Sequence, residues 1–360
     1  MKAKAIASFI AIKVVAISTL ALYANYQGTS LSKILHRWDA QWYRRIAENG
    51  YGYLVTAADG RHLSDYAFFP VFPFLERQLH EIFGLSYIYS GVAISAVASI
   101  VAAAGIYSIG VKITSQRVAL YLVIGWALLP IAIVQSIAYS ESLFTALSVW
   151  ALYFTLKKNW FAAGVLASLA GATRPTGIAV IAAVVITAML HFRRHRRDQS
   201  ALLAIFLAPV GLVGYIYWVS RQLSGGASYF TVTEGWGNDI DGGVAFIAWI
   251  KELLHNGSAV SAIAIAAAFL VLIALLIALI KSGTPAPLII YSAVLVALSL
   301  VTSGYFGSKP RYLLPAFPLL IPIVTFIGHR KASERKTIAF IAAVISIAYG
   351  SIWLTGSGPL

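Results

Sequence analysis

The chain has 360 residues, of which 59% are hydrophobic and 11% are charged, and its formal net charge is +14. Soluble domains carry about 25% charged residues, so this composition excludes an ordinary water-soluble protein and indicates a membrane protein. The apolar runs are continuous rather than alternating, which predicts membrane-spanning helices and not a β-barrel.

The basic residues fall in short clusters between the apolar runs, as the positive-inside bias places them, so we expect no nucleic-acid partner. The chain contains no cysteine, which excludes disulfides, thiolate catalysis and zinc–thiolate sites. In the most basic tract, residues 191–197, His191 and His195 have a spacing that suits a metal. The four arginines beside them instead favour contact with anionic lipid headgroups.

The pattern along the chain predicts an all-α polytopic membrane protein with one integral-membrane domain and about eleven transmembrane helices. Lys2 and Lys4 precede the first apolar run and place the N-terminus in the cytoplasm. The expected segments are a first span in 1–24, an extracytoplasmic loop in 25–86, spans two to seven in 87–220, a second extracytoplasmic loop in 221–257, and C-terminal spans in 258–360.

A span over residues 118–136 is expected to lead to a short external turn at residues 138–142. Two short spans are expected to meet at residues 173–177. With this topology only Asp198 and Glu334 among the acidic residues lie on the inner side, so we expect any carboxylate chemistry to be extracytoplasmic.

The stretch of residues 36–51 is the most unusual part of the first loop. If it is helical, His36, Asp39 and Tyr43 share one face. A second face then holds Trp38, Trp42 and Arg45, and the two indoles are interpreted as interfacial membrane anchors. The residues alone leave two interpretations of Asp39: a general base that removes a proton from an acceptor hydroxyl, or a carboxylate paired with neighbouring arginines.

Several segments together resemble the PIG-V family, that is, GPI mannosyltransferase 2 and its bacterial homologues, which are integral-membrane enzymes of the GT-C fold. The tryptophan–aspartate run, Arg37 to Tyr43, is the most specific of them. The others are residues 46–51, 68–73, 139–144, 173–177 and 311–318.

This resemblance implies a GT-C helical bundle whose large first loop contains interfacial helices. It implies transfer of a sugar, typically mannose, from a polyprenyl-phosphate carrier on the outer face by an inverting displacement. We expect no cofactor, and a divalent metal is not expected either. GT-C enzymes generally place an essential acidic residue in the first loop, and Asp39 is the matching position. The implied partners are the lipid-linked donor, a hydroxyl acceptor on a glycolipid, glycan or protein, and membrane lipids.

Such a reaction needs cations to stabilise the charge that develops on the leaving phosphate. Arg174 and Arg311 are the candidates, because each is expected at the outer membrane boundary, where a lipid-linked phosphate would lie. Lys309 is an alternative to Arg311. Further candidates for substrate contacts are His36, Tyr43, Arg44, Arg45 and Glu141, and Glu141 is alternatively the first residue of a helix.

Asp239 and Asp241 form an Asp-x-Asp pair of the kind that holds a metal in soluble nucleotide-sugar transferases. A Gly/Asp/Asn-rich loop is also what an ordinary turn contains, so we expect no metal there. Two other classes of function stay open: a transporter or flippase for lipid-linked sugars, and a non-catalytic membrane subunit. Inverted repeats and ionisable residues at mid-membrane depth would be typical of a transporter, whereas here the charges gather at the outer boundary.

Overall fold

The computed structural model describes residues 1–304 and 309–356. Within these residues, six helical segments are long and apolar enough to cross a membrane. They are α1 (Lys2–Tyr26), α5 (Tyr87–Ile113), α9 (Ile178–Arg194) with its preceding turn η3 (Pro175–Gly177), α10 (Gln199–Leu207) joined to α11 (Val210–Gln222), α14 (Ala259–Lys281) and α18 (Ala332–Thr355).

Shorter apolar helices complete the bundle. They are α7 (Glu141–Leu156), α8 (Trp160–Gly171), α15 (Ala286–Val301) and η5 (Phe317–Leu319) running into α17 (Leu320–Gly328). The multi-pass helical architecture is confirmed. The figure of eleven spans stays a prediction.

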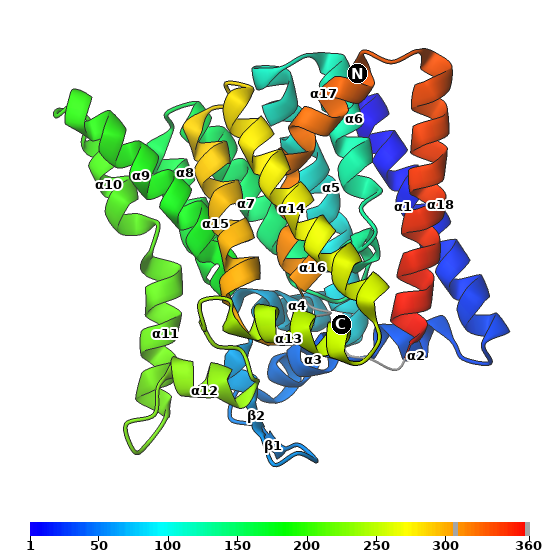
Figure 1. Cartoon of the computed structure of the whole chain (residues 1–360). Helices are drawn as coiled ribbons and strands as arrows, with labels where there is room; N and C mark the ends of the chain where they lie inside the picture. Colours follow the sequence, from blue (N-terminus) through cyan, green and yellow to red (C-terminus); the bar gives the residue numbers. More distant parts are fainter. Residues whose placement is uncertain (305–308, 357–360) are drawn as a thin grey trace.

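Small elements from both predicted loops gather at one end of the bundle, and we call them the cap (Figure 1). The first loop contributes α2 (Leu31–Leu35), α3 (Asp39–Asn49), β1 (Leu54–Thr56), β2 (His62–Ser64), η1 (Asp65–Ala67) and α4 (Val71–Phe83), and the second contributes α12 (Tyr229–Gly235) and α13 (Val244–His255). The strands pair antiparallel, with Leu54 opposite Ser64. The N-terminus lies at the opposite end of the bundle (Figure 1).

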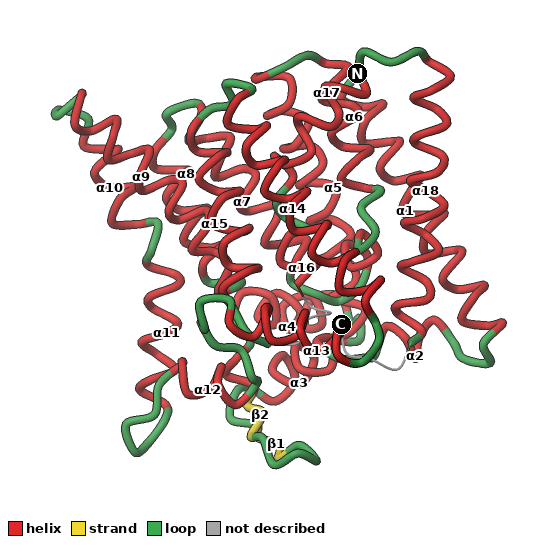
Figure 2. The backbone as a smooth tube through the Cα atoms, in the orientation of Figure 1, coloured by secondary structure: helices red, strands yellow, loops and turns green. Residues whose placement is uncertain are grey.

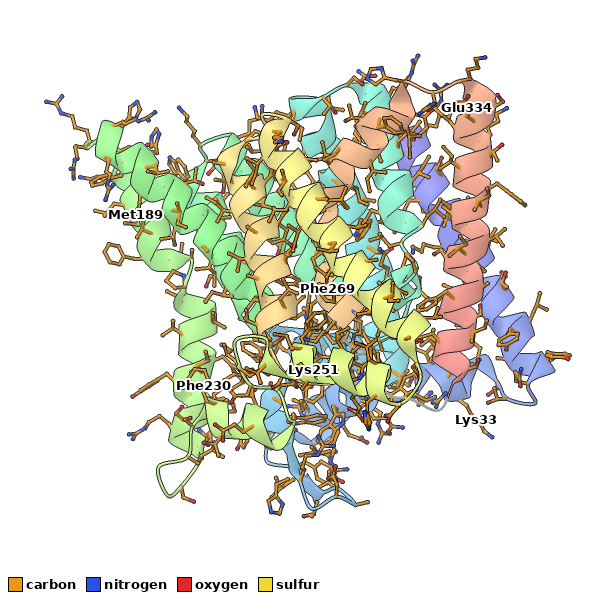
Figure 3. All side chains as sticks on the ribbon, in the orientation of Figure 1. Lys33, Met189, Phe230, Lys251, Phe269 and Glu334 are labelled. Carbon is orange, nitrogen blue, oxygen red and sulfur yellow. The ribbon has the colours of Figure 1, made fainter. Side chains whose placement is uncertain are left out.

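The outer surface of the bundle is apolar between two charged ends. Lys33 and Lys251 lie at the cap end and Glu334 at the other (Figure 3). On α14, Val260 is 83% exposed and Leu270 is 67% exposed. Side chains of this kind facing outward are stable in hydrocarbon and not in water, so the surface matches a lipid environment.

Small residues allow the central helices to approach closely. A Cβ atom on Gly105 of α5 would lie 2.5 Å from Val149 of α7, and one on Gly110 would lie 2.8 Å from the Cβ of Ala119. Packing of this kind drives helix association where no water is displaced. Ala119 belongs to α6 (Gln116–Ala127), and α5 is therefore clamped between α6 and α7.

The helix expected over residues 118–136 is wrong in its second half. Helix α6 ends at Ala127, shortly before Pro130, and the chain continues as an irregular, mostly buried segment that contains the short turn η2 (Ala132–Ser136) (Figure 2). Lys13 of α1, itself buried, donates from Nζ to the carbonyl oxygens of Ala127 at 3.4 Å and Ala132 at 2.9 Å. Irregular backbone inside a membrane bundle needs such partners, because no water is available to bond its carbonyls.

Candidate active site

Asp39 is the first residue of helix α3, and its position depends on a sharp bend just before it. Trp38 adopts φ +54° and ψ −124°. The chain changes direction at this residue, and helix α3 begins at the next one. A positive φ is strained for a bulky residue and persists only when surrounding contacts impose it. The Arg37 guanidinium lies 4.0 Å from the centre of the Trp38 ring. A carboxylate in the first turn is also favoured by the helix dipole.

The bend corrects the expectation of one helix over residues 36–51. His36 lies outside α3 and so does not share a face with Asp39 and Tyr43. Its Nδ1 instead contacts the carbonyl oxygen of Ser32 at 2.6 Å, and its ring lies edge-on to Tyr89. The structure therefore separates His36 from the carboxylate.

Arg311 joins Asp39 to a second carboxylate. It belongs to the short helix α16 (Lys309–Leu313). Its Nη2 lies 2.5 Å from Asp39 Oδ2 and 2.5 Å from Glu141 Oε1, and its Nε donates to the same Glu141 oxygen at 2.7 Å. One planar guanidinium thus binds two carboxylates, a task that a lysine ammonium cannot perform with the same geometry.

Arg174 completes the cluster from the turn before η3. Its Nη1 forms an ion pair with Glu141 Oε2 at 3.1 Å and donates to the hydroxyl of Ser140 at 2.9 Å. The Ser140 hydroxyl is also 2.7 Å from the phenol oxygen of Tyr43. Glu141 therefore binds both arginines. We call these four charged residues, Asp39, Glu141, Arg174 and Arg311, the charged cluster.

Burial differs across the charged cluster. The side chain of Glu141 is fully buried, and those of Arg311 and Arg174 are 4% and 11% exposed. Asp39 is 25% exposed. Of the two carboxylates, Asp39 is the one that a molecule arriving at the cap end can reach.

Three distant parts of the chain contribute the residues that surround Asp39. Glu141 begins α7 directly after the irregular segment that Lys13 supports. Arg174 stands where α8 and η3 meet, as the sequence predicts. Arg311 comes from the segment between α15 and α17. The five residues of the predicted external turn, 138–142, are buried within the protein, and their location on the outer face stays a prediction.

Three other predicted contact residues lie away from the cluster. Arg44 pairs at 3.8 Å with Glu48 on its own helix, and the Arg45 guanidinium stacks 3.4 Å above the Tyr53 ring. Lys309 does not replace Arg311. Its Nζ donates to the carbonyl oxygens of Ser299 at 2.9 Å and Thr302 at 2.6 Å.

Trp42 does not fit the interpretation of an interfacial anchor. Its ring stacks on Phe68 with centroids 5.5 Å apart and meets Trp236 edge-on at 5.0 Å. Trp236 follows α12, so this aromatic contact fastens the second loop to the first. Aromatic pairs of this kind stabilise beyond their buried area, so Trp42 holds the cap together.

Asp239 and Asp241 accept hydrogen bonds from nearby backbone N–H groups. Asp239 Oδ1 accepts from the N–H of Ile240, and the carboxylate of Asp241 accepts from the N–H groups of Gly243 and Ala245 at the start of α13. Within residues 1–304 and 309–356, no three His, Asp or Glu side chains come together as metal ligands.

Sequence reasoning missed two buried ionisable residues. Lys13 lies within the first predicted span, and an ionisable group within an apolar span is itself a sign of a specific role. Glu76 of α4 lies on the buried face of its helix beside Phe72. Its carboxyl lies directly against Gly91, where an added Cβ atom would be 2.1 Å from Oε1 of Glu76. Neither carboxyl oxygen has a hydrogen-bond partner among the described residues.

Comparisons with known proteins address the fold. The sequence model of the dolichyl-phosphate-mannose-protein mannosyltransferase family matches residues 67–218, a range that includes Glu141 and Arg174 but neither Asp39 nor Arg311. No curated protein matches the sequence of the chain. Among solved structures, ArnT from Cupriavidus metallidurans bound to undecaprenyl phosphate is 14% identical, with a TM-score of 0.57 over 93% of this chain and 62% of ArnT.

The oligosaccharyltransferase of Archaeoglobus fulgidus, in its complex with zinc and sulfate, is 13% identical, with a TM-score of 0.55 over 97% of this chain. The archaeal oligosaccharyltransferase AglB from Archaeoglobus fulgidus, in complex with an inhibitory peptide and a dolichol-phosphate, gives 11% identity and a TM-score of 0.53. The chain has the GT-C fold. It spans 62% of the length of ArnT and 53% to 56% of the archaeal proteins.

Proposed function

We propose that the chain is an inverting glycosyltransferase that takes its sugar from a polyprenyl-phosphate carrier and acts on the extracytoplasmic face. The observation that supports this most is the charged cluster, in which a reachable carboxylate stands beside two buried arginines within a GT-C fold. A hydroxyl acceptor needs a base, and a phosphate leaving group needs cations, and the cluster offers both.

In the proposed reaction, Asp39 takes the proton of the acceptor hydroxyl as that oxygen forms a bond to the anomeric carbon. The bond from this carbon to the phosphate oxygen breaks, and the electron pair leaves with the polyprenyl phosphate. Arg311 and Arg174 stabilise the phosphate charge. Glu141 acts as a positioning residue, because it holds both guanidinium groups in the buried cluster.

The ion pair between Arg311 and Asp39 suggests how the base becomes available. A phosphate that binds Arg311 competes with Asp39 for the same N–H donors. Binding of the donor thus frees the carboxylate to accept a hydrogen bond from the acceptor hydroxyl. The base is therefore expected to work only when the lipid-linked donor is present.

The proposed sugar is mannose, and the proposed acceptor is a hydroxyl on a glycolipid, a glycan or a protein. Mannose rests on the resemblance of residues 37–43 to the PIG-V family and on the mannosyltransferase family model that matches residues 67–218. The polyprenyl-phosphate donor is supported by the two fold neighbours that carry undecaprenyl phosphate and a dolichol-phosphate.

The test is transfer of radiolabelled mannose from polyprenyl-phosphate-mannose to acceptors in native membranes and then by the purified protein in lipid nanodiscs. Asp39→Asn and Asp39→Ala should lower the rate by about 10²- to 10⁴-fold, which is the range for loss of a general base. Glu48→Gln, on the exposed side of the same helix, is the matched control. Near-native transfer by Asp39→Asn, or movement of the label across the membrane without a new glycosidic bond, would overturn the proposal.

A further inference from the structure

A second site lies outside the charged cluster. A cavity of about 630 Å³ opens between the cap-side ends of α1 and α18 and the helix α2. Its polar lining residues are Tyr23, Gln27, Thr29, Lys33, Arg37 and Thr355. The cavity is thus formed by the first helix α1, the last helix α18 and the segment that leads to Asp39.

The charge of this cavity differs from that of the charged cluster. Lys33 and Arg37 are both cationic, and among the described residues no carboxylate lines the cavity. In the charged cluster each arginine already pairs with a carboxylate. An anion therefore meets uncompensated positive charge in the cavity, whereas in the charged cluster it has to displace a carboxylate first.

Both cations have donors to offer. Lys33 is exposed, and its ammonium group forms no hydrogen bond or ion pair with the described part of the chain. Arg37 donates from Nη1 to the Leu354 carbonyl at 3.0 Å and from Nη2 to the Gly356 carbonyl at 2.7 Å. A guanidinium carries five N–H groups, so these two bonds fix Arg37 in place and leave donors for an anion.

The cavity is also reachable from the lipid. Helices α1 and α18 form one edge of the bundle, and α2 lies at their cap-side ends (Figure 1). Leu22 of α1 is 73% exposed and Ile352 of α18 is 60% exposed. A hydrocarbon tail can lie along these apolar side chains while its polar head enters the cavity, because lipid phosphates occupy the depth at which spanning helices end.

We propose that this cavity binds the anionic phosphate group of a membrane lipid, at a site separate from the charged cluster. Phosphatidylglycerol and a polyprenyl phosphate share this chemistry. The proposal does not depend on the transfer reaction. Arg37, two residues before Asp39, would then bind two groups. Its guanidinium donates to the carbonyl oxygens at the end of α18 and would also bind the lipid phosphate.

Native mass spectrometry of the full chain in detergent tests this, with dioleoyl phosphatidylglycerol, undecaprenyl phosphate and dioleoyl phosphatidylcholine added separately. Lys33→Glu is the informative variant, because Lys33 is exposed and a glutamate three residues after the N-cap Ser30 suits the start of α2. It should weaken retention of the anionic lipids about tenfold. The matched control is Lys251→Glu, an exposed lysine at the same end of the molecule (Figure 3).

Loss with both anionic lipids supports a general phosphate site, and loss with undecaprenyl phosphate alone supports a site for the carrier lipid. Equal retention by Lys33→Glu and the native chain, or an equal loss in Lys251→Glu, would overturn the proposal. Asp39→Asn should retain the lipid as the native chain does. A chain that binds the lipid through Lys33 but transfers no sugar would refute the proposed function and leave this site intact.

Discussion

Nη2 of Arg311 lies 2.5 Å from Oδ2 of Asp39, although 272 residues separate the two in the sequence. Arg311 is also bound to Glu141, so a single guanidinium holds the exposed carboxylate and the buried one together. In the proposed reaction this relationship controls when Asp39 can act as a base, because the arginine that would stabilise the leaving phosphate is bound to the Asp39 carboxylate in the absence of a phosphate.

Replacing Arg311 by lysine should keep the charge and lose the function. An ammonium group is a point charge and cannot bind Asp39 and Glu141 in one plane, so the transfer rate should fall by about 10²-fold or more. The assay is sugar transfer by purified protein. Arg330→Lys, at the other end of the bundle, is the control and should keep the native rate. Equal activity of Arg311→Lys and the native chain would show that the planar geometry is not needed.

Neutralising Glu141 should destabilise the fold. Glu141→Gln leaves the buried Arg174 without its carboxylate and removes one of the two carboxylates of Arg311, and breaking a buried pair costs about 3–5 kcal/mol. Thermal unfolding in detergent should show this as a lower midpoint. The double variant Glu141→Gln, Arg174→Met should recover part of the loss, because the unpaired charge is then absent. An additive effect of the two changes would contradict the direct pairing seen between them.

The buried carboxyl of Glu76 should make stability depend on pH. Burial raises the pKa of Glu76 well above its usual value of 4.5. The folded state therefore favours the protonated form, and this contribution is present below the unfolded pKa and is lost as the pH rises through the folded pKa. Glu76→Gln lacks this loss, so it should match the native chain at about pH 4.5 and exceed it in stability at alkaline pH.

Unfolding midpoints across this pH range provide the measurement. Glu81→Gln, which removes an exposed carboxylate from the same helix α4, should follow the native curve throughout. A Glu76→Gln curve parallel to the native one would mean that the native carboxyl does not titrate with a raised pKa.

Removing the ammonium group of Lys13 should weaken the buried segment that leads to the charged cluster. Lys13→Met deletes the donor to the carbonyl oxygens of Ala127 and Ala132. Leaving such buried groups unbonded costs about 1–3 kcal/mol. Thermal unfolding is the measurement, and Lys4→Met, on an exposed position of the same helix, should behave as the native chain. Unchanged stability of Lys13→Met would show that these carbonyls find other partners.

Much of the fold could be predicted because it depends on local composition. Apolar runs of spanning length must form helices in lipid, since every backbone N–H and C=O group has to be bonded within the segment. The same reasoning placed the break at Thr173 to Gly177 and the two large loops. It failed at Trp38, where the chain bends through a positive φ, and after Ala127, where a side chain from another helix bonds the irregular segment.

By itself, the sequence determined that the chain is a helical membrane bundle with a large first loop, while the resemblance of residues 37–43 to the PIG-V family made Asp39 the predicted catalytic residue. Only the tertiary structure decided that Arg174 and Arg311 meet around Glu141, that His36 and Lys309 stand apart, and that Trp42 packs within the cap. The physical reason is that helix formation follows from residues three and four apart, whereas ion pairs join residues that only packing brings within 3 to 4 Å.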